Sequence, residues 1–195
     1  MRKGQRGYSL AEILTVIAVI GVIVAAAVPA FFTLQRRAAL RSAAAQLRVI
    51  FHENRSRAIA RGRNCGMKFV LIGGRWHFAV YDDGDGDGVR NDDIKSGRDR
   101  LVAPPRVVFR ESRAVSIGLL SVAIKDPDGD PLPPTKSPVA FNQSAICSFS
   151  PIGESTPGTI YLTEGGRELY AVRVYGATAK IRMLRYVRQT KRWVS

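Results

Sequence analysis

Glu12 is the only charged residue in an apolar stretch that runs from Tyr8 to Phe32. The stretch is about 25 residues long, which is enough for a helix to cross a bilayer. A carboxylate inside lipid costs a few kcal/mol unless it finds a partner, so an acidic residue here is expected to have a function. Glu12 is therefore a candidate functional residue.

Two ordinary kinds of segment compete for this stretch. A secretory signal peptide would explain the basic start Met1–Gly7, the apolar core and the small residues around Ala30. However, the stretch is long for a signal core, and Glu12 interrupts its beginning. A plain membrane anchor explains the length but leaves the cost of Glu12 unexplained. A third alternative rests on a resemblance that is described below.

The loop from Asp82 to Gly88 is the second candidate site. Its alternating aspartates and final glycine match the start of an EF-hand-type calcium loop, in which oxygen ligands converge on a hard cation. Ile94 occupies the place of the closing glutamate. Two alternatives stay open, a solvated acidic turn and a calcium site. The metal ligands of such a site would be Asp83, Asp85, Asp87, Val89 and Asn91, with Asp92 or Asp93 as substitutes for Asn91.

Basic residues dominate the chain, and the C-terminal end carries many of them. Thirty Lys and Arg residues against sixteen Asp and Glu give a net charge of +14, which favours polyanionic partners such as nucleic acid, anionic lipid or acidic proteins. Tyr186 and Trp193 are interleaved with C-terminal cations, so bases could stack there while the cations meet phosphates. The alternative is a solvated surface or a contact with acidic neighbours. The candidate DNA-binding residues are Lys180, Arg182, Arg185, Arg188, Lys191 and Arg192.

The sequence gives little support for catalysis, so we expect no enzyme activity and no required cofactor. His52 and His77 lack a recognisable nucleophile motif beside them. Cys65 and Cys147 are too few for a disulfide framework, and their spacing does not fit a zinc site. If the domain lies outside the cytoplasm, the two cysteines could form one bridge; two separate buried thiols are the alternative.

The apolar stretch is expected to continue as an amphipathic helix. Apolar residues recur at steps of three and four between Leu40 and Ala58, which is typical of one buried helix face. Gly62 and Asn64 mark the end of the helix. A helix from Tyr8 to Gly62 would be roughly 80 Å long at 1.5 Å per residue.

The rest of the chain is expected to form antiparallel strands. Met67–Ile72 and Arg75–Tyr81 flank Gly73 and Gly74, which is a strong hairpin signal. Further strands are predicted at Thr159–Thr163, Glu168–Tyr175 and Ala179–Val187, with weaker ones at Arg106–Arg110, Val115–Ile124 and Val139–Phe141. We therefore predict an α+β fold, in which a long N-terminal helix packs on an antiparallel β-sheet domain.

The segment Gly7–Leu14, with the sequence GYSLAEIL, resembles the prepilin cleavage motif of type IV pilins and type II secretion pseudopilins. The resemblance implies cleavage after Gly7 by a prepilin peptidase and methylation of the new N-terminal residue, Tyr8. It also implies that Glu12 pairs with the N-terminal amine of a neighbouring subunit during filament assembly. Pro29 matches a position at which the family bends or loosens the helix.

The globular region resembles the GspH/FimT family of minor pilins and pseudopilins. The resemblance lies in Ile146–Gly153, in Gly158–Leu162 and in the stretch Thr178–Arg182, where Ala179 and Lys180 replace the Gly-Arg that the family often carries. It implies a pilin-like fold and a filament subunit in the bacterial inner membrane, single-pass, with the globular domain in the periplasm. Some FimT-type minor pilins are DNA receptors.

The predicted organisation has four parts, with a functional expectation for the whole. We expect a minor pseudopilin or pilin of a type II secretion or type IV pilus system, at the filament tip or in its initiation complex, with other pilin subunits as partners. The alternatives are a DNA-binding minor pilin and a membrane-tethered calcium-binding module. The parts are the leader 1–7, the transmembrane or filament-core helix 8–32, the amphipathic helix 33–62 and the β-rich domain 63–195.

Overall fold

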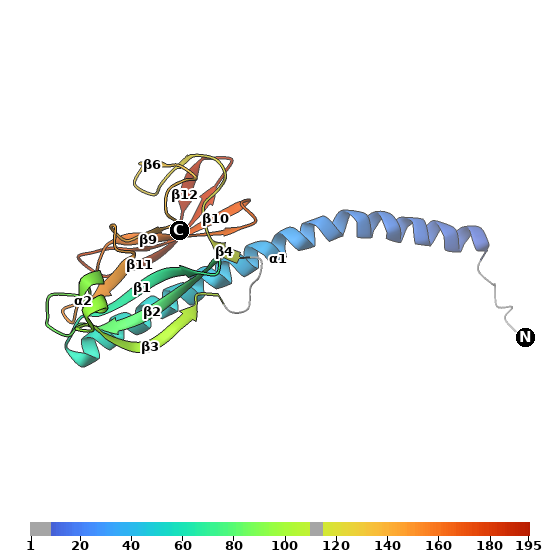
Figure 1. Ribbon diagram of the computed structural model, residues 1–195. Coiled ribbons are helices and arrows are strands. Elements are labelled where there is room, and N and C mark those ends of the chain that lie inside the picture. The colour runs from blue at the N-terminus through green and yellow to red at the C-terminus, as the bar shows by residue number, and fades with distance from the viewer. Residues whose placement is uncertain (1–8, 110–114) are drawn as a thin grey trace, which may run out of the picture. The chain divides into compact units, whose positions relative to one another are not determined.

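The computed structural model describes residues 9–109 and 115–195 and divides the chain into two units, up to Ala38 and from Ala39 to Ser195. Helix α1 runs from Leu10 to Arg61 and contributes to both units (Figure 1). Gly7 and Tyr8, with the rest of the leader, lie outside the described residues. The α+β fold predicted from the sequence is confirmed, since one long apolar helix precedes an antiparallel β domain.

The second unit contains two larger antiparallel sheets and one small hairpin. The first sheet has the order β3-β2-β1-β8 and is built from Arg100–Val107, Arg75–Asp82, Cys65–Ile72 and Ile146–Phe149. The second has the order β12-β11-β10-β9-β4, with β7 also paired to β9. Its strands, in chain order, are β4 Val115–Ile117, β7 Val139–Ala140, β9 Gly158–Glu164, β10 Glu168–Val174, β11 Ile181–Val187 and β12 Arg192–Val194. Strands β5 (Ile124–Lys125) and β6 (Pro131–Leu132) form the small hairpin, and α2 (Asn91–Ser96) is a short helix.

The main core lies between the last part of α1 and the two larger sheets. Phe51 is fully buried at its centre. Its ring lies 6.2 Å from Phe69 on β1, 6.0 Å from Phe141 and 6.2 Å from Phe149 on β8, measured between centroids. The apolar helix stripe predicted from Leu40 to Ala58 supplies the helix side of this core. Helix and sheets are thus joined chiefly by apolar burial.

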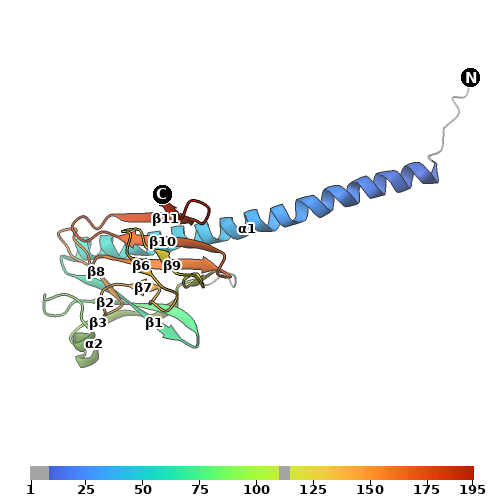
Figure 2. The same ribbon diagram turned by 90° about the horizontal axis from the view of Figure 1, so that it is seen from above.

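A smaller apolar cluster covers the opposite face of the second sheet. Figure 2 shows β9, β10 and β11 side by side in this sheet. Tyr161, Tyr186 and Trp193 pack there, with ring centroids 6.0 Å apart for Tyr161–Trp193 and 5.3 Å for Tyr186–Trp193. The indole of Trp193 donates a hydrogen bond to the carbonyl of Lys125 at 2.9 Å. The β5–β6 region is therefore tied down onto this face of the sheet.

The predicted strands match the structure best where a glycine turn marks the hairpin. Both predicted hairpins are present, as β1–β2 and β9–β10. The segment Val115–Ile124, predicted as one strand, is instead divided into β4 and β5. The strand predicted at Arg106–Arg110 begins earlier, at Arg100, as the outermost strand of its sheet. Pro104 and Pro105 lie inside it, and an edge strand tolerates prolines because their missing N–H groups need not pair with a neighbour.

Ala179 occupies a position that suits glycine. Its φ is +45°, in the left-handed region, and its side chain is fully buried in the main core. In the resemblance described above, this is the position at which the GspH/FimT family often carries glycine. An L-residue other than glycine is strained at such a φ. Burial of the alanine methyl group in the core offsets part of that strain.

Candidate functional site

The N-terminal helix is the first candidate functional element. Within the described residues, α1 is long and apolar enough to cross a membrane. Glu12 lies in its first turn with its side chain exposed. The helix continues through Pro29, and the Thr33 hydroxyl donates a hydrogen bond to the Pro29 carbonyl at 3.0 Å. The structure therefore places Glu12 on an unbroken apolar helix, whereas the cleavage site is not described.

The acidic loop is held at the junction between α1 and the first sheet. Asp82, at the end of β2, is buried and accepts ion pairs from two arginines in the last turns of α1. Arg57 Nε lies 3.1 Å from Asp82 Oδ1, and Arg61 pairs with the other oxygen. This double pair fixes the end of the helix against the strand from which the loop emerges.

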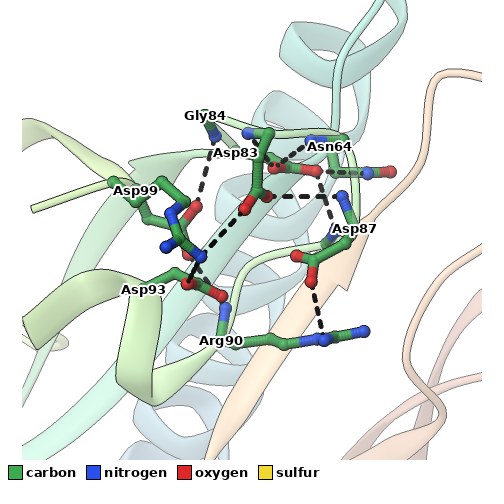
Figure 3. Close-up of polar contacts among 11 residues, drawn as sticks. Asn64, Asp83, Gly84, Asp87, Arg90, Asp93 and Asp99 are labelled. Atoms are coloured by element: carbon green, nitrogen blue, oxygen red, sulfur yellow. Dashed lines mark hydrogen bonds and ion pairs between the residues drawn. The ribbon is translucent and has the colours of Figure 1, made fainter. Parts of the chain in front are cut away.

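Asp83 organises the loop itself. The residue is only 3% exposed. One oxygen accepts hydrogen bonds from the backbone N–H groups of Asp85 at 3.1 Å and Gly86 at 2.8 Å. The other accepts from the Asn64 side chain at 2.6 Å and from the N–H of Gly88 at 2.8 Å. Figure 3 shows Asn64 and the surrounding loop converging on Asp83. The loop is thus folded around one buried carboxylate.

These hydrogen bonds shift the acidity of Asp83. Burial by itself raises the pKa of the carboxyl group. The bonds from the Asn64 side chain and from the N–H groups of Gly86, Gly88 and Asp85 outweigh burial, and the pKa lies below its usual value. Hydrogen bonds that are made to the charged form favour that form. Asp83 is therefore ionised at neutral pH, and its carboxylate oxygens are occupied by hydrogen bonds within the protein.

Arginines neutralise the other carboxylates of the loop. Arg98 lies 3.2 Å from Asp85 and 2.7 Å from the buried Asp93, and Arg90 lies 2.6 Å from Asp87. A further buried carboxylate, Asp99, accepts from the backbone N–H of Gly84 at 3.2 Å and of Arg90 at 2.9 Å. The loop is thus closed by ion pairs and backbone hydrogen bonds of its own (Figure 3).

The arrangement brings together three of the five predicted metal ligands. Oxygen atoms of Asp83, Asp85 and Asp87 lie within 4.8 Å of one another. The other two predicted ligands, the backbone carbonyl of Val89 and the side chain of Asn91, stay predictions. Asn91 lies at the start of α2, where its amide donates to the Ser144 carbonyl at 3.4 Å. Three converging carboxylate oxygens can hold a hard divalent cation.

Sequence reasoning missed the residues that balance the charge of this loop. Arg98 and Asp99 follow α2, a helix that the sequence analysis did not predict because its six residues are too few for a visible period. From the sequence alone, Asn64 indicates only the end of a helix. A signal was available for Arg90, which follows Asp87 by three residues, a spacing that brings side chains together in a turn.

The candidate DNA-binding residues do not share one face of the second sheet. Arg182 lies opposite Arg173 on β10, on the face that carries the smaller apolar cluster. Arg185 pairs with Tyr170, and Arg192 with Val187, on the other face. Lys180, Arg188 and Lys191 lie outside the strands and are exposed. Cations from this segment are therefore spread around the sheet.

The aromatic residues of this segment pack against one another. Tyr186 is 7% exposed, and Trp193 is half-buried against it and Tyr161. The expectation that bases stack on Tyr186 is therefore wrong for this structure, whereas stacking on Trp193 stays a prediction. These rings bury apolar area in the smaller cluster, which stabilises the fold instead.

Cys65 and Cys147 lie in neighbouring strands as free, buried thiols. Because Cys147 pairs with Met67, the two cysteines are diagonal neighbours across β1 and β8. Burial, and then the nearby Asp82, raises the pKa of Cys65 to about 12, and burial raises the pKa of Cys147. Both thiols are therefore poorly reactive. A bridge between them stays a prediction.

Comparison with known proteins identifies the N-terminal segment. Residues 2–28 match the family model of the prokaryotic N-terminal methylation motif. The chain is type IV pilin-like at its N-terminus. The motif indicates a membrane-anchored pilin or pseudopilin-like subunit that a prepilin peptidase processes and that assembles with other pilins. No curated protein and no solved structure matched the chain.

Proposed function

We propose that this type IV pilin-like chain is a minor pseudopilin or pilin of the GspH/FimT kind. It would be held in the bacterial inner membrane by α1, with the β domain in the periplasm, and would join the tip or initiation complex of a secretion pseudopilus or a type IV pilus. The methylation motif at residues 2–28, followed by a single long apolar helix, carries this proposal.

Glu12 would set the register of assembly. Cleavage after Gly7 would free an α-amino group on Tyr8, and the Glu12 carboxylate could pair with the amine of a neighbouring subunit. Removing one member of a buried ion pair costs about 3–5 kcal/mol. A subunit that entered out of register would leave Glu12 unpaired in an apolar environment, so this pair would favour one stagger.

Processing and assembly can be tested separately. We expect mass spectrometry of the protein co-expressed with a prepilin peptidase to show loss of residues 1–7 and one methyl group on Tyr8. We expect Glu12→Gln to be processed normally but to enter filaments at least about tenfold less, because the amide removes the charge from the pair. The yield of the chain in sheared filaments measures this incorporation.

The control for this experiment is Thr15→Val. This change replaces another polar side chain, one turn along the same helix, with an apolar one. It should leave both processing and incorporation unchanged. A mature N-terminus at Phe31 would instead indicate an ordinary signal peptide and overturn the proposal. Normal incorporation of Glu12→Gln would overturn the role of Glu12 while leaving the pilin assignment in place.

DNA uptake is an alternative function, supported by the exposed cations Lys180 and Arg182 near Arg173. If these cations contact phosphates, the double variant Lys180→Glu/Arg182→Glu should weaken DNA binding. The slope of the logarithm of the binding constant against the logarithm of the salt concentration should also become less steep, by about two. The titration uses the segment Ala39–Ser195. The variant Arg185→Glu/Arg192→Glu carries the same charge change on the other face and serves as the control.

Either of two results would contradict DNA binding as the function. Binding that is absent at near-physiological salt would leave the cations as a surface for solubility or for filament contacts. Equal weakening in both double variants would show that only net charge is sensed. In each case the secretion or pilus-assembly function would stand.

We also propose that the acidic loop takes up a calcium ion, as in the alternative of a membrane-tethered calcium-binding module. The three converging carboxylates of Asp83, Asp85 and Asp87 support this. Calcium would have to displace Arg98 from Asp85. Because that competition lowers affinity, we expect a Kd on the order of 0.1–1 mM, the range of extracellular calcium modules.

Arg98 provides the sharpest test of calcium binding. Replacing the competing cation by Arg98→Ala should tighten calcium binding, whereas Asp87→Asn should weaken it, both measured by isothermal titration calorimetry. Arg63→Ala, a change of the same charge outside the loop, should leave the affinity unchanged. Absence of calcium binding in both the parent chain and Arg98→Ala would show that the loop is a turn closed by its own arginines.

A further inference from the structure

The tip of the β1–β2 hairpin carries exposed apolar side chains. Val70, Leu71 and Ile72 are 36%, 56% and 47% exposed at the end of β1. Gly73 and Gly74 form the turn with φ values of +56° and +74°, which permits a tight two-residue connection. Trp76 lies opposite Leu71 and is half-buried. The hairpin thus presents a compact apolar tip instead of the polar residues usual at a turn.

The hairpin tip lies at the end of the unit where α1 enters it. Arg61 contacts Asp82, which pairs with Cys65 at the start of β1, and Phe51 contacts Phe69 further along β1. Helix and strand therefore run antiparallel. At rises of 1.5 Å per helical residue and 3.3 Å per strand residue, the Gly73–Gly74 turn is level with about residue 41.

Other turns gather at the same end of the unit. Leu71 and Trp76 line a hollow together with Val115 on β4. Val115 pairs with Glu164 at the end of β9, and Arg188 donates a hydrogen bond to the Gly166 carbonyl in the β9–β10 turn at 2.9 Å. Figure 1 shows β4 and the β9–β10 turn at the end where α1 enters the unit. The β1–β2 and β9–β10 turns therefore form one surface.

This surface is basic. We call it the basic pole and define it by the apolar tip residues Leu71 and Ile72 and by the exposed cations Arg75, Arg167 and Arg188. Arg75 pairs with Ile72 across the hairpin. Among the described residues of the two turns and the strand ends beside them, Glu164 and Glu168 are acidic; Glu164 is buried and Glu168 half-buried. Exposed arginines therefore lie beside the apolar tip and at the neighbouring β9–β10 turn.

We propose that the basic pole docks on the surface of an anionic bilayer. Leu71 and Ile72 enter the headgroup region, and the surrounding arginines meet lipid phosphates. An apolar tip with cations beside it combines the two attractions that hold proteins at such interfaces. The chain itself supports this occupant, since only Thr33–Ala39 separates the apolar stretch ending at Phe32 from Leu40, the first buried residue of the unit.

This inference rests on the proposed anchoring of α1, which holds the basic pole close to the membrane. Anchoring supplies a high effective concentration, so a weak surface contact is enough to populate a docked state. Docking would hold the globular unit against the bilayer before the subunit enters a filament. Neutral lipid would provide the apolar contact without the electrostatic attraction, so docking should depend on anionic lipid.

The test uses the full chain in nanodiscs that hold one copy each, with a second set of discs that hold two copies for comparison. An environment-sensitive fluorophore is attached at Ile72→Cys or at the control Ile152→Cys, an apolar residue that is 80% exposed in the loop beside Arg55, towards the other end of the helix. Cys65 and Cys147 are buried and should not be labelled. The discs contain either phosphatidylcholine alone or phosphatidylcholine with phosphatidylglycerol, an anionic lipid whose negative surface potential attracts basic residues.

We expect the label at position 72 to shift to the blue and to be quenched by lipid-borne quenchers in anionic discs, and the label at position 152 to report water in both. Arg75→Glu/Arg188→Glu should lower the ratio of docked to undocked protein at least about 25-fold, because each basic residue near the surface contributes about fivefold. Arg63→Glu, exposed next to the helix end, is the control that should change docking little.

Three results would overturn docking. The label at position 72 could behave like that at 152, its shift could be equal in neutral and anionic discs, or it could be buried only in discs that hold two copies, which would indicate contact between subunits. Circular dichroism of each variant checks that it is folded. Flotation of the full chain with vesicles tests the anchor separately, so a failure of the proposed anchoring is distinguishable from a failure of docking.

Discussion

Replacing Phe51 by alanine is expected to lower the free energy of unfolding of the globular unit by about 4 kcal/mol. Phe51 is fully buried and meets Phe69, Phe141 and Phe149, at centroid distances of 6.2, 6.0 and 6.2 Å. Its removal would cost the transfer energy of the ring and leave a cavity among three aromatic side chains that cannot readily collapse.

Denaturation of the segment Ala39–Ser195 by urea measures this loss. Val49→Ala, on the same helix at 53% exposure, is the matched control and should change stability by less than about 1 kcal/mol. A loss of under about 1 kcal/mol for Phe51→Ala would mean that the helix does not depend on this aromatic contact. Such a small loss would contradict the packing of α1 on the first sheet and on Phe141 through Phe51.

Replacing Asp83 by asparagine, in the presence of a chelator, is expected to destabilise the same segment by about 3 kcal/mol. The two side chains have nearly the same shape, so the effect comes from hydrogen bonding. The amide oxygen would keep the bonds from Asp85 and Gly86, but the NH2 group would face the donors of Asn64 and Gly88. Two charge-assisted bonds would be lost in a buried site.

Asp85→Asn is the matched control for Asp83→Asn. Asp85 lies in the same loop and pairs with Arg98, whose side chain is 57% exposed, so its replacement should cost less than about 1 kcal/mol. The two variants have the same change in net charge. Equal destabilisation of both would show that loop charge matters and that the hydrogen bonds to Asp83 do not.

The parent segment should also lose stability in acid through Asp83. Its pKa in the folded protein lies below the usual value, so the unfolded chain takes up the proton first. The contribution is fully present above the unfolded pKa of about 3.9 and is lost as pH falls through the folded pKa. Denaturation at pH 6 and pH 3 should therefore show a smaller pH effect in Asp83→Asn than in the parent segment.

The sequence alone determined the class of the N-terminal element. A long apolar stretch with one glutamate after a basic start is a local property of the sequence. Its length can be compared directly with the thickness of a bilayer, so it predicts a membrane-spanning helix without any tertiary contact. The hairpin β1–β2 was predicted for a similar reason, since Gly73 and Gly74 adopt a turn that few other residues allow. The stripe from Leu40 to Ala58 likewise follows from helical period.

Only the tertiary structure decided how the charged residues of the β domain are used. Asp83 and Asn64 are separated by β1 and β2, so nothing local shows that they bond. The hairpin tip and Arg188 come from opposite ends of the domain sequence, and strand pairing places them at one pole. Pairing register also put Arg182 and Arg185 on opposite faces. Such non-local contacts depend on how the whole chain packs, which periodicity and spacing do not encode.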